Sequence, residues 1–396
     1  MMAEGTDRAN ARDEYNGLAE VQPGLPSEQY YASGHFEREL QRIWHRHWLY
    51  LCRADTLARA LDYRTFEIGA QPLLLLRDEA GALRAFFNTC RHRGSVLCAE
   101  GAGRLRASSL TCPYHGWTYD LRGRLARIPS HGRPAPMDRE AYAGYALYEL
   151  ALREWGGFVF VSLSDEASTG FEAAFEPGLE TLAHWPLQEL AVGHTHTMTL
   201  RCNWKVFWDN YNECLHCPNV HPALAALVPI YGRAIMAEQD DRNWRAHAQS
   251  ADPKFKGGLR AHAETWSRDG RAGAHRFEAL SEAERRMGYH FVTMLPSMYM
   301  VGHVDYVRAV RLRPLGPGET ELEAQWLYPR AALDDPSFDV HNTVDFATQV
   351  LTEDARVCEL AQRGLRARPH RHGVLLPEEY ELARFHRWVR AALERP

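Results

Sequence analysis

Hydrophobic and polar positions divide the chain into segments of different periodicity. Residues 1–26 are polar and rich in Gly and Pro, which predicts a loose N-terminal arm. Residues 27–48 carry apolar and aromatic side chains at helical spacing between charged ones, which predicts a first helix with one buried face. Residues 49–163 consist of short runs rich in branched and aromatic side chains, separated by Gly, Asp and Pro, and this pattern predicts an all-β domain.

Residues 164–396 mix both periodicities, which predicts an α+β domain. Helical spacing is found in segments 170–187, 202–215, 344–365 and 377–393. Strand-like runs are found in segments 288–294, 297–301 and 322–327. The polar stretch 237–273 is weakly patterned and is expected to form long loops.

The composition is that of an ordinary globular protein, with 45% hydrophobic and 24% charged residues in 396 positions. No run approaches the roughly 18 apolar residues of a membrane span, and the polar N-terminus does not resemble a secretory signal, so a cytoplasmic location is expected. The eight cysteines are then expected to be reduced thiols or metal ligands. A net charge of −5 gives no overall attraction to nucleic acid, and no nucleotide-binding glycine motif is found.

Two Cys-His pairs lie within the predicted β domain. Cys90 and His92 are followed, after nineteen residues, by Cys112 and His115. Thiolate and neutral imidazole are the donors that zinc or an iron-sulfur cluster prefers. Zinc knuckles usually pair like with like, whereas each pair here contributes one thiolate and one imidazole. The arrangement favours a [2Fe-2S] cluster with two thiolates on one iron and two imidazoles on the other, with a structural zinc as the alternative.

The segments NTCRHRG at 88–94 and CPYHGWTYD at 112–120 resemble the two ligand loops of the Rieske [2Fe-2S] domain in ring-hydroxylating oxygenase α subunits. The resemblance implies that the cluster is held by Cys90, His92, Cys112 and His115. The interval between the loops is slightly longer than is usual in this family, so we expect a longer hairpin at 101–109 and an intact cluster. Cys98, between the loops, is expected to be a buried thiol.

The region around these loops is basic. Residues 81–130 contain eight Arg against two acidic residues, a net charge of +6 in a chain whose total is −5. We expect an acidic electron-transfer partner to be attracted to this region, with an ordinary solvated face as the alternative.

A second set of possible metal ligands lies in NWKVFWDNYNECLHCPNVHP at 203–222. Glu213 and His216 are three residues apart and would share a helix face, whereas His216 and His221 would diverge by about 140° on a straight helix. Pro218 is expected to break the helix after His216, so that both imidazoles reach one ion. Two His and a carboxylate form the facial triad of non-haem Fe(II) oxygenases. Two ordinary histidines at a helix end are the alternative.

The same segment is similar to the N-W-K … E-x-x-H-x4-H signature of the catalytic domain in that family. The resemblance implies that His216 and His221 bind the iron. It also marks Glu213 as the acidic residue that links the two redox centres. Cys214 and Cys217 are expected to pack beside the triad and are not assigned as ligands.

The third iron ligand is expected in TEDARVCELAQRGL at 352–365, which resembles the C-terminal helix of the family. Glu353 and Asp354 are adjacent, and only one of them can point inward. The family pattern ends its acidic pair with the ligand, so Asp354 is the expected third ligand.

The resemblance covers most of the chain and implies an α+β fold, in which a Rieske [2Fe-2S] antiparallel β domain is inserted in a helix-grip (START-like) catalytic domain. It implies a [2Fe-2S] cluster, a mononuclear Fe(II), O2 and an organic substrate. It also implies a homotrimer, because the cluster passes its electron to the iron of the adjacent subunit. The chain carries no flavin or nicotinamide fingerprint, so a separate NAD(P)H-dependent reductase, with or without a ferredoxin, is expected.

The implied activity is hydroxylation of an aromatic or small organic substrate. The alternative is a Rieske monooxygenase that demethylates a quaternary ammonium or an N- or O-methyl compound, since the E-C-x-H-C-P run is more similar to the betaine- and carnitine-type homotrimeric members. An electron-transfer Rieske protein is disfavoured, because it has no use for Glu213, His216 and His221. A zinc-binding module is the third alternative, and it would show no visible absorption. The expected cavity residues are Phe207, Trp208, Tyr211, Met294, Met298 and Tyr299.

Overall fold

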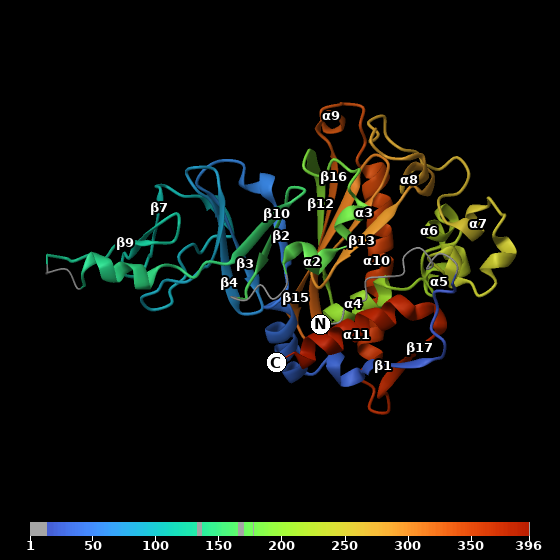
Figure 1. The fold of residues 1–396 in the computed structure, drawn as a ribbon, viewed down its shortest axis with the longest axis horizontal. Coiled ribbons are helices and arrows are strands. Elements are labelled where there is room, and N and C mark those ends of the chain that lie inside the picture. Colours follow the sequence, from blue (N-terminus) through green and yellow to red (C-terminus); the bar gives the residue numbers. More distant parts are fainter. Residues whose placement is uncertain (1–13, 133–136, 165–169, 177, 396) are drawn as a thin grey trace.

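A five-stranded antiparallel sheet forms the centre of the α+β domain (Figure 1). The computed structural model describes residues 14–132, 137–164, 170–176 and 178–395. In spatial order the strands are β12 (Leu190–Leu200), β16 (Glu319–Pro329), β15 (Val307–Gly316), β14 (Met298–Gly302) and β13 (His290–Met294). Strands β12 and β15 were not expected from the sequence, because polar or charged side chains interrupt their apolar alternation.

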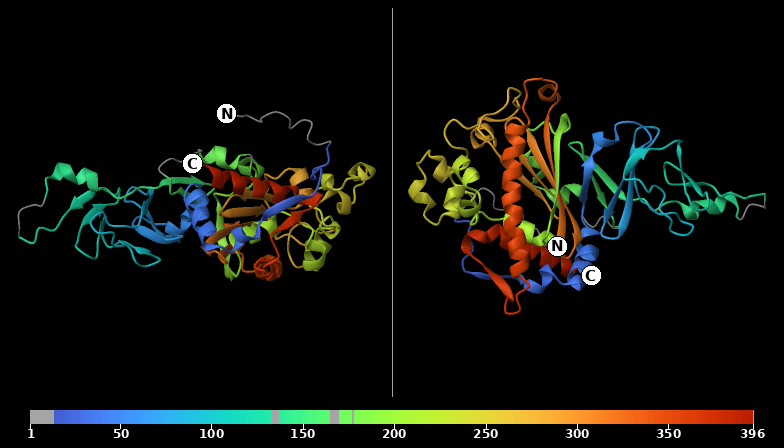
Figure 2. Two further views of the ribbon diagram at one scale, coloured as in Figure 1. Left: turned by 90° about the horizontal axis from the view of Figure 1, so that it is seen from below. Right: turned by 180° about the vertical axis from the view of Figure 1, so that it is seen from behind.

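The helix α10 (His341–Gly364) covers one face of this sheet, as Figure 2 shows from behind. Helices α4 (Trp204–Tyr211) and α11 (Tyr380–Glu394) pack into the same core. The short helices α2 (Phe171–Phe175) and α3 (Gly178–Thr181) lie toward the opposite face (Figure 1). The segment 170–187 therefore contains two short helices.

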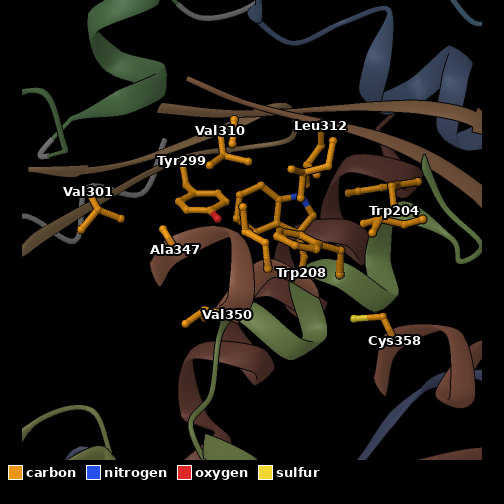
Figure 3. Close-up of a cluster of buried hydrophobic side chains, with 14 of the residues drawn as sticks. Trp204, Trp208, Tyr299, Val301, Val310, Leu312, Ala347, Val350 and Cys358 are labelled. Carbon is orange, nitrogen blue, oxygen red and sulfur yellow. The ribbon is translucent and has the colours of Figure 1, made fainter. Parts of the chain in front are cut away.

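Large aromatic side chains join the sheet to α4 and α10 (Figure 3). Trp204 and Trp208 come from α4, Tyr299 and Val301 from β14, and Ala347 from α10; all five are at most 2% exposed. Because side chains alternate along a strand, Tyr299 and Val301 share the α10 face, while their neighbours face the other way. This close packing fixes α4 and α10 beside each other, and the candidate site lies where they meet.

The β domain consists of three small antiparallel sheets that extend away from the central sheet (Figure 1). One contains β5 (Leu83–Phe87), β4 (Gln71–Arg77), β3 (Asp62–Ile68) and β6 (Ala102–Arg104); another contains β7 (Ser109–Thr111), β8 (Thr118–Asp120) and β9 (Leu125–Arg127). The third contains β10 (Ala151–Trp155), β11 (Phe158–Ser162) and β2 (Leu49–Arg53).

The chain enters and leaves the β domain through two paired strands. Strands β2 and β11 are antiparallel neighbours and are buried along their whole length. Their alternate side chains contribute to the cores on the two faces of the central sheet. The β domain is therefore an insertion that is anchored at its base within the α+β domain.

The prediction of a longer hairpin at 101–109 is wrong. Strand β6 pairs with β3, whereas β7 pairs with β8, so this segment crosses from one sheet to another. Strand β3 provides the pairing partner for the backbone of β6, and no local pattern indicates such a long-range pairing.

The two ends of the described chain also differ from expectation. Part of the expected loose arm is strand β1 (Gln22–Pro26), which pairs with β17 (His372–Leu375) near the other end of the sequence. The expected first helix is interrupted: a 3₁₀ turn at Ser27–Tyr30, then α1 (Ser33–Glu39) and a π-helical segment at Leu40–Trp44. The break occurs at Ala32, whose backbone is extended.

Short helices connect these elements. They are α5 (Cys217–Val220), α6 (Pro222–Leu227), α7 (Pro253–Lys256), α8 (Glu282–Met287) and α9 (Arg330–Leu333). The stretch 237–273 has only α7 and isolated 3₁₀ turns, as expected for long loops. Across the described residues, no helix combines the length and apolar character that crossing a bilayer requires.

Candidate metal sites and substrate cavity

Two histidines and one aspartate from separate elements converge beside α4. One possible ligand atom from each of His216, His221 and Asp354 lies within 4.8 Å of the others. Oδ1 of Asp354, on α10, is 2.9 Å from Nε2 of His221 and 3.5 Å from Nε2 of His216. Asn210 on α4 donates to the same Oδ1 at 2.7 Å. Sequence reasoning missed Asn210, although it lies within the signature segment.

The chain reaches this geometry by a different route from the expected one. Helix α4 ends at Tyr211, so Glu213 lies in a loop rather than on a helix face with His216. Pro218 occupies the first turn of α5, where its missing N–H costs nothing, and it starts a helix instead of breaking one. The carboxylate of Glu213 accepts a hydrogen bond from the amide of Leu215 and thereby stabilises the loop.

Each imidazole is held at Nδ1 by a further carboxylate. Oε1 of Glu213 is 2.6 Å from Nδ1 of His216, and Oε2 of Glu353 is 2.7 Å from Nδ1 of His221. Such contacts orient both rings so that Nε2 faces the common point. Of the adjacent acidic residues on α10, Asp354 faces this point and Glu353 lies behind His221. The geometry therefore favours Asp354 over Glu353 as a ligand.

The charges of the three residues are coupled. Burial alone would raise the pKa of Asp354, but hydrogen bonds with His216 and His221 lower it to about 2. Burial alone would lower the pKa of His216, but Asp354 and Glu213 raise it to about 9. When a metal binds, it displaces the proton from Nε2 of each imidazole. An ionised carboxylate and two oriented neutral imidazoles are the donor set of a mononuclear Fe(II) site, so these residues fit that metal.

A cavity of about 80 Å³ adjoins the three residues. Tyr211 and Tyr299 line it, as expected, together with Trp266 and Phe291. Its wall also contains a buried cation, Arg308. Sequence reasoning missed Trp266 and Arg308, since one lies in a weakly patterned loop and the other in an unrecognised strand.

Four of the expected cavity residues lie elsewhere. Phe207 and Trp208 are buried behind the cavity wall, in the core between α4 and the sheet. The prediction that Met294 and Met298 line the cavity is wrong, because their side chains belong to the core on the opposite face of the sheet. The two-residue alternation of β13 and β14 places them there.

The two Cys-His loops of the β domain have the same backbone design. Gly94 and Gly116 each lie four residues after the loop cysteine, donate to that cysteine's carbonyl, and have φ of +71°. This left-handed conformation favours glycine. The equivalent turns bring the two loops together, so that the rings of His92 and His115 are 4.7 Å apart.

The thiols and imidazoles of these loops differ in burial. Cys90 and Cys112 are free and buried, whereas His92 is exposed and His115 half-buried. Burial raises the pKa of Cys112, but hydrogen bonds with the amides of Tyr114 and His115 and with the side chains of Cys90 and Ser95 lower that pKa overall. Two inner thiols and two outer imidazoles fit a Rieske [2Fe-2S] cluster with an accessible histidine edge.

The remaining cysteines test the expected reduced state. Cys98 is a free, buried thiol whose pKa burial raises to about 11, which confirms its expected character. Cys214 and Cys217 form a disulfide beside His216, so the expectation that all cysteines are reduced is wrong for this pair. Their spacing of three residues in a turn brings the two sulfurs together.

Comparisons with known proteins agree with this geometry. Residues 187–395 match the ring hydroxylating alpha subunit (catalytic domain) family, and residues 47–146 match the Rieske [2Fe-2S] domain. The chain therefore belongs to the family of ring-hydroxylating α subunits. It is an oxygenase, and its metal groups are a [2Fe-2S] cluster and a mononuclear iron. The resemblance stated from the sequence and the fold that it implied are confirmed.

Among its relatives is the glycine betaine monooxygenase oxygenase subunit of Chromohalobacter salexigens, which is 28% identical over 92% of this chain and 85% of that protein. The chloroplastic choline monooxygenase of Beta vulgaris is 28% identical over 93% of this chain and 77% of that protein. A quaternary ammonium Rieske monooxygenase solved with L-carnitine has a TM-score of 0.69 at 22% identity, covering 94% of this chain and 96% of that one.

Proposed function

We propose that the chain is the oxygenase component of a multicomponent system and oxidises a small quaternary ammonium compound. In this proposal His216, His221 and Asp354 hold the mononuclear iron. The [2Fe-2S] cluster is held by Cys90, His92, Cys112 and His115. When bound, the cluster supplies single electrons and the mononuclear iron activates O2 toward the substrate.

The cavity beside the three iron-binding residues carries this proposal. Its volume of about 80 Å³ is far below the roughly 300–1,000 Å³ of pockets for drug-sized ligands, so it suits a small substrate better than a polycyclic arene. Tyr211 and Tyr299, with ring centroids 4.3 Å apart, form part of an aromatic wall. Aromatic faces bind quaternary ammonium groups by cation–π attraction. The betaine and choline relatives support the same substrate class.

Glu213 is the proposed link between the two metal centres. It contacts His216 at one oxygen, and it lies between the substrate cavity and a larger depression of about 360 Å³. Its role is to keep the Nδ1 proton of His216 in place and to present a carboxylate toward an incoming histidine. Strand β7 and helix α5 lie on opposite sides of the central sheet (Figures 1 and 2), which supports transfer between subunits of a homotrimer.

Electrons are proposed to come from a separate NAD(P)H-dependent reductase, with or without a ferredoxin, in the cytoplasm. Arginines around the cluster loops support an acidic docking partner. Some of them are already engaged: Arg91 donates to the carbonyl of Ala146, and Arg84 pairs with Asp78 at 3.3 Å. The ion pair of Arg84 makes the positive charge of this region smaller than the sequence count, whereas Arg91 keeps its charge.

A single turnover tests this function without the reductase. The iron-loaded protein is reduced with dithionite, freed of excess reductant, and mixed with O2 and one compound at a time. We expect cluster reoxidation and product with glycine betaine, L-carnitine, γ-butyrobetaine or choline, with formaldehyde as the readout where an N-methyl group is hydroxylated. Product from naphthalene or toluene, and from none of the ammonium compounds, would refute the proposed substrate class.

A further inference from the structure

Arg308 places a positive charge in the wall of the substrate cavity. It lies on the central strand β15, between Val301 of β14 and Trp326 of β16. Its residue is 4% exposed, and it lines the same cavity as Asp354. The guanidinium is therefore held by a rigid sheet, beside the position where a substrate would react.

The guanidinium of Arg308 lacks a partner in the described part of the chain. Its Nε and Nη1 are buried without a hydrogen bond, and no described carboxylate forms an ion pair with it. Its Cζ lies over the ring of Trp266, 5.8 Å from the ring centroid. The indole N–H of Trp266 is also buried without an acceptor. Two residues that line the cavity, Arg308 and Trp266, therefore have buried donors without an acceptor.

Arg311 shows that the fold can pair the charge of a buried arginine, although its Nε, like that of Arg308, has no hydrogen-bond partner. It lies three residues further along β15, on the opposite face, and is 8% exposed. It donates to the carbonyl of Leu51 at 2.9 Å and pairs with Glu323 at 3.1 Å. Burying a charge without such partners is costly, and the cost is normally offset by a ligand or a function.

We propose that Arg308 binds a carboxylate group of the substrate. This inference rests on the proposed function and narrows it: the substrate is a zwitterion that carries a quaternary ammonium group and a carboxylate. The planar guanidinium matches a carboxylate through two parallel hydrogen bonds. The ammonium group lies against the wall that contains Tyr211 and Tyr299. Asp354 lines the same cavity, but its Oδ1 engages both histidines, and it forms no ion pair with Arg308 among the described residues.

Glycine betaine and choline form a matched pair of probes. Both carry a trimethylammonium group, and they differ in a carboxylate against an alcohol. We expect isothermal titration of the metal-loaded protein to give at least about tenfold tighter binding of glycine betaine or γ-butyrobetaine than of choline. Arg308→Met should abolish this preference, and Arg308→Lys should retain part of it. The visible spectrum of the cluster and the iron content should not change.

Two controls separate specificity from folding. Arg308→Met should keep or raise the thermal midpoint, since it removes an unpaired buried charge. Arg311→Met should lower the midpoint, because it leaves Glu323 unpaired, yet it should preserve the ligand preference.

The outcomes distinguish this inference from the proposed function. Equal binding of glycine betaine and choline, or an unchanged preference in Arg308→Met, would overturn the role of Arg308 and leave an ammonium substrate intact. Arg308-dependent binding of benzoate or butyrate, without binding of any ammonium compound, would support Arg308 and refute the proposed substrate class. Binding of neither these carboxylates nor any of the ammonium compounds would overturn both.

Discussion

His216 and His221 are each held at Nδ1 by a different carboxylate, and the surroundings of the two carboxylates differ. Glu213 lines the outer depression as well as the cavity, whereas Glu353 on α10 receives a hydrogen bond from Gln349 at 2.9 Å. Glu353 thus belongs to a network within its own helix. Glu213 also lines the outer depression, where the proposed contact with a neighbouring subunit would form.

Glu213→Gln should leave both metal groups bound and the cluster reducible, yet slow the transfer of electrons to the iron. The amide keeps the size of the side chain but loses the charge that orients His216, so a partial loss is expected; Glu213→Ala should lose nearly all transfer. The measurement is cluster reoxidation in a single turnover. Normal reoxidation and product in Glu213→Ala would contradict the proposed link.

Glu353→Gln is the matched control, because it changes the carboxylate that contacts the other imidazole, that of His221. Iron affinity should fall by about 10–100-fold, since its partner His221 is less well oriented. Once the protein is saturated with iron, reoxidation of the cluster should proceed normally. A transfer defect in this variant equal to that of Glu213→Gln would remove the distinction between the two carboxylates.

Asp305 lies away from both metal sites, and its contribution to stability is predicted to depend on pH. Burial raises its pKa to about 6 from an ordinary 3.8, although Thr265 and the amide of Gly273 donate to it. Between these values the unfolded chain has released the proton and the folded chain retains it, so stability falls as pH rises through about 6. The effect is at most about 3 kcal/mol.

Asp305→Asn removes this titration. We expect the unfolding midpoint of the wild type, relative to that of the variant, to decrease between pH 4 and pH 7. Only the change of this difference with pH is diagnostic, because the amide also alters the hydrogen bonds. A constant difference across the range would contradict the raised pKa.

At the scale of elements, one fully buried ion pair ties α4 to α1. Nζ of Lys205 is 2.6 Å from Oε1 of Glu39, and the indole of Trp204 donates to the other oxygen at 2.8 Å. Neither charged side chain is exposed. Because α4 leads directly into the Glu213 loop, this pair helps to fix the start of the segment that carries the site.

Lys205→Met should lower stability by about 3–5 kcal/mol, because it leaves Glu39 buried and unpaired. The thermal midpoint of the cluster-loaded protein measures the loss. Adding Glu39→Gln should recover part of it, since the double variant buries no charge while the indole of Trp204 keeps an acceptor. No recovery in the double variant would show that packing around Lys205, rather than its charge, causes the loss.

Elements with strong local periodicity were predictable from the sequence. Helices α10 and α11 were expected near their observed positions, because their apolar residues recur three and four apart over several turns. Strand β15 was missed, since Arg308 and Arg311 interrupt an otherwise apolar run. Carboxylates of the neighbouring strand β16 pair with Arg311, whereas Arg308 has no ion pair among the described residues. Neither arrangement can be read from the local sequence.

In the candidate site, too, the features set by local spacing were predictable from the sequence, and those set by long-range contacts were not. The spacing around His216 and His221 and the acidic pair on α10 pointed to the three residues that converge. The Nδ1 partners and the arginine in the cavity wall depend on contacts between distant elements, so no local pattern indicates them. The expected helix break at Pro218 was wrong because the side chain of Glu213 stabilises a loop before that proline.

At the scale of the whole molecule, the proposed electron transfer between subunits predicts complementation between two inactive chains. Cys112→Ser should lack the cluster, and His216→Ala should lack the mononuclear iron. When the two chains are produced together and mix randomly in trimers, about a quarter of wild-type activity should return, since half of the chains retain iron and half of their neighbours retain a cluster. Mixed trimers without activity would indicate transfer within one chain.

The pairing of β1 with β17 also has a consequence for biosynthesis. Gln22 is opposite Leu375, so one of the first strands to leave the ribosome has a partner that is among the last. At about 5–20 residues per second, the interval is between roughly 20 and 70 s. During that time β1 has unpaired backbone groups, while the inserted β domain can already fold. Nascent chains stalled before residue 372 should therefore leave the N-terminal segment accessible to proteases and chaperones.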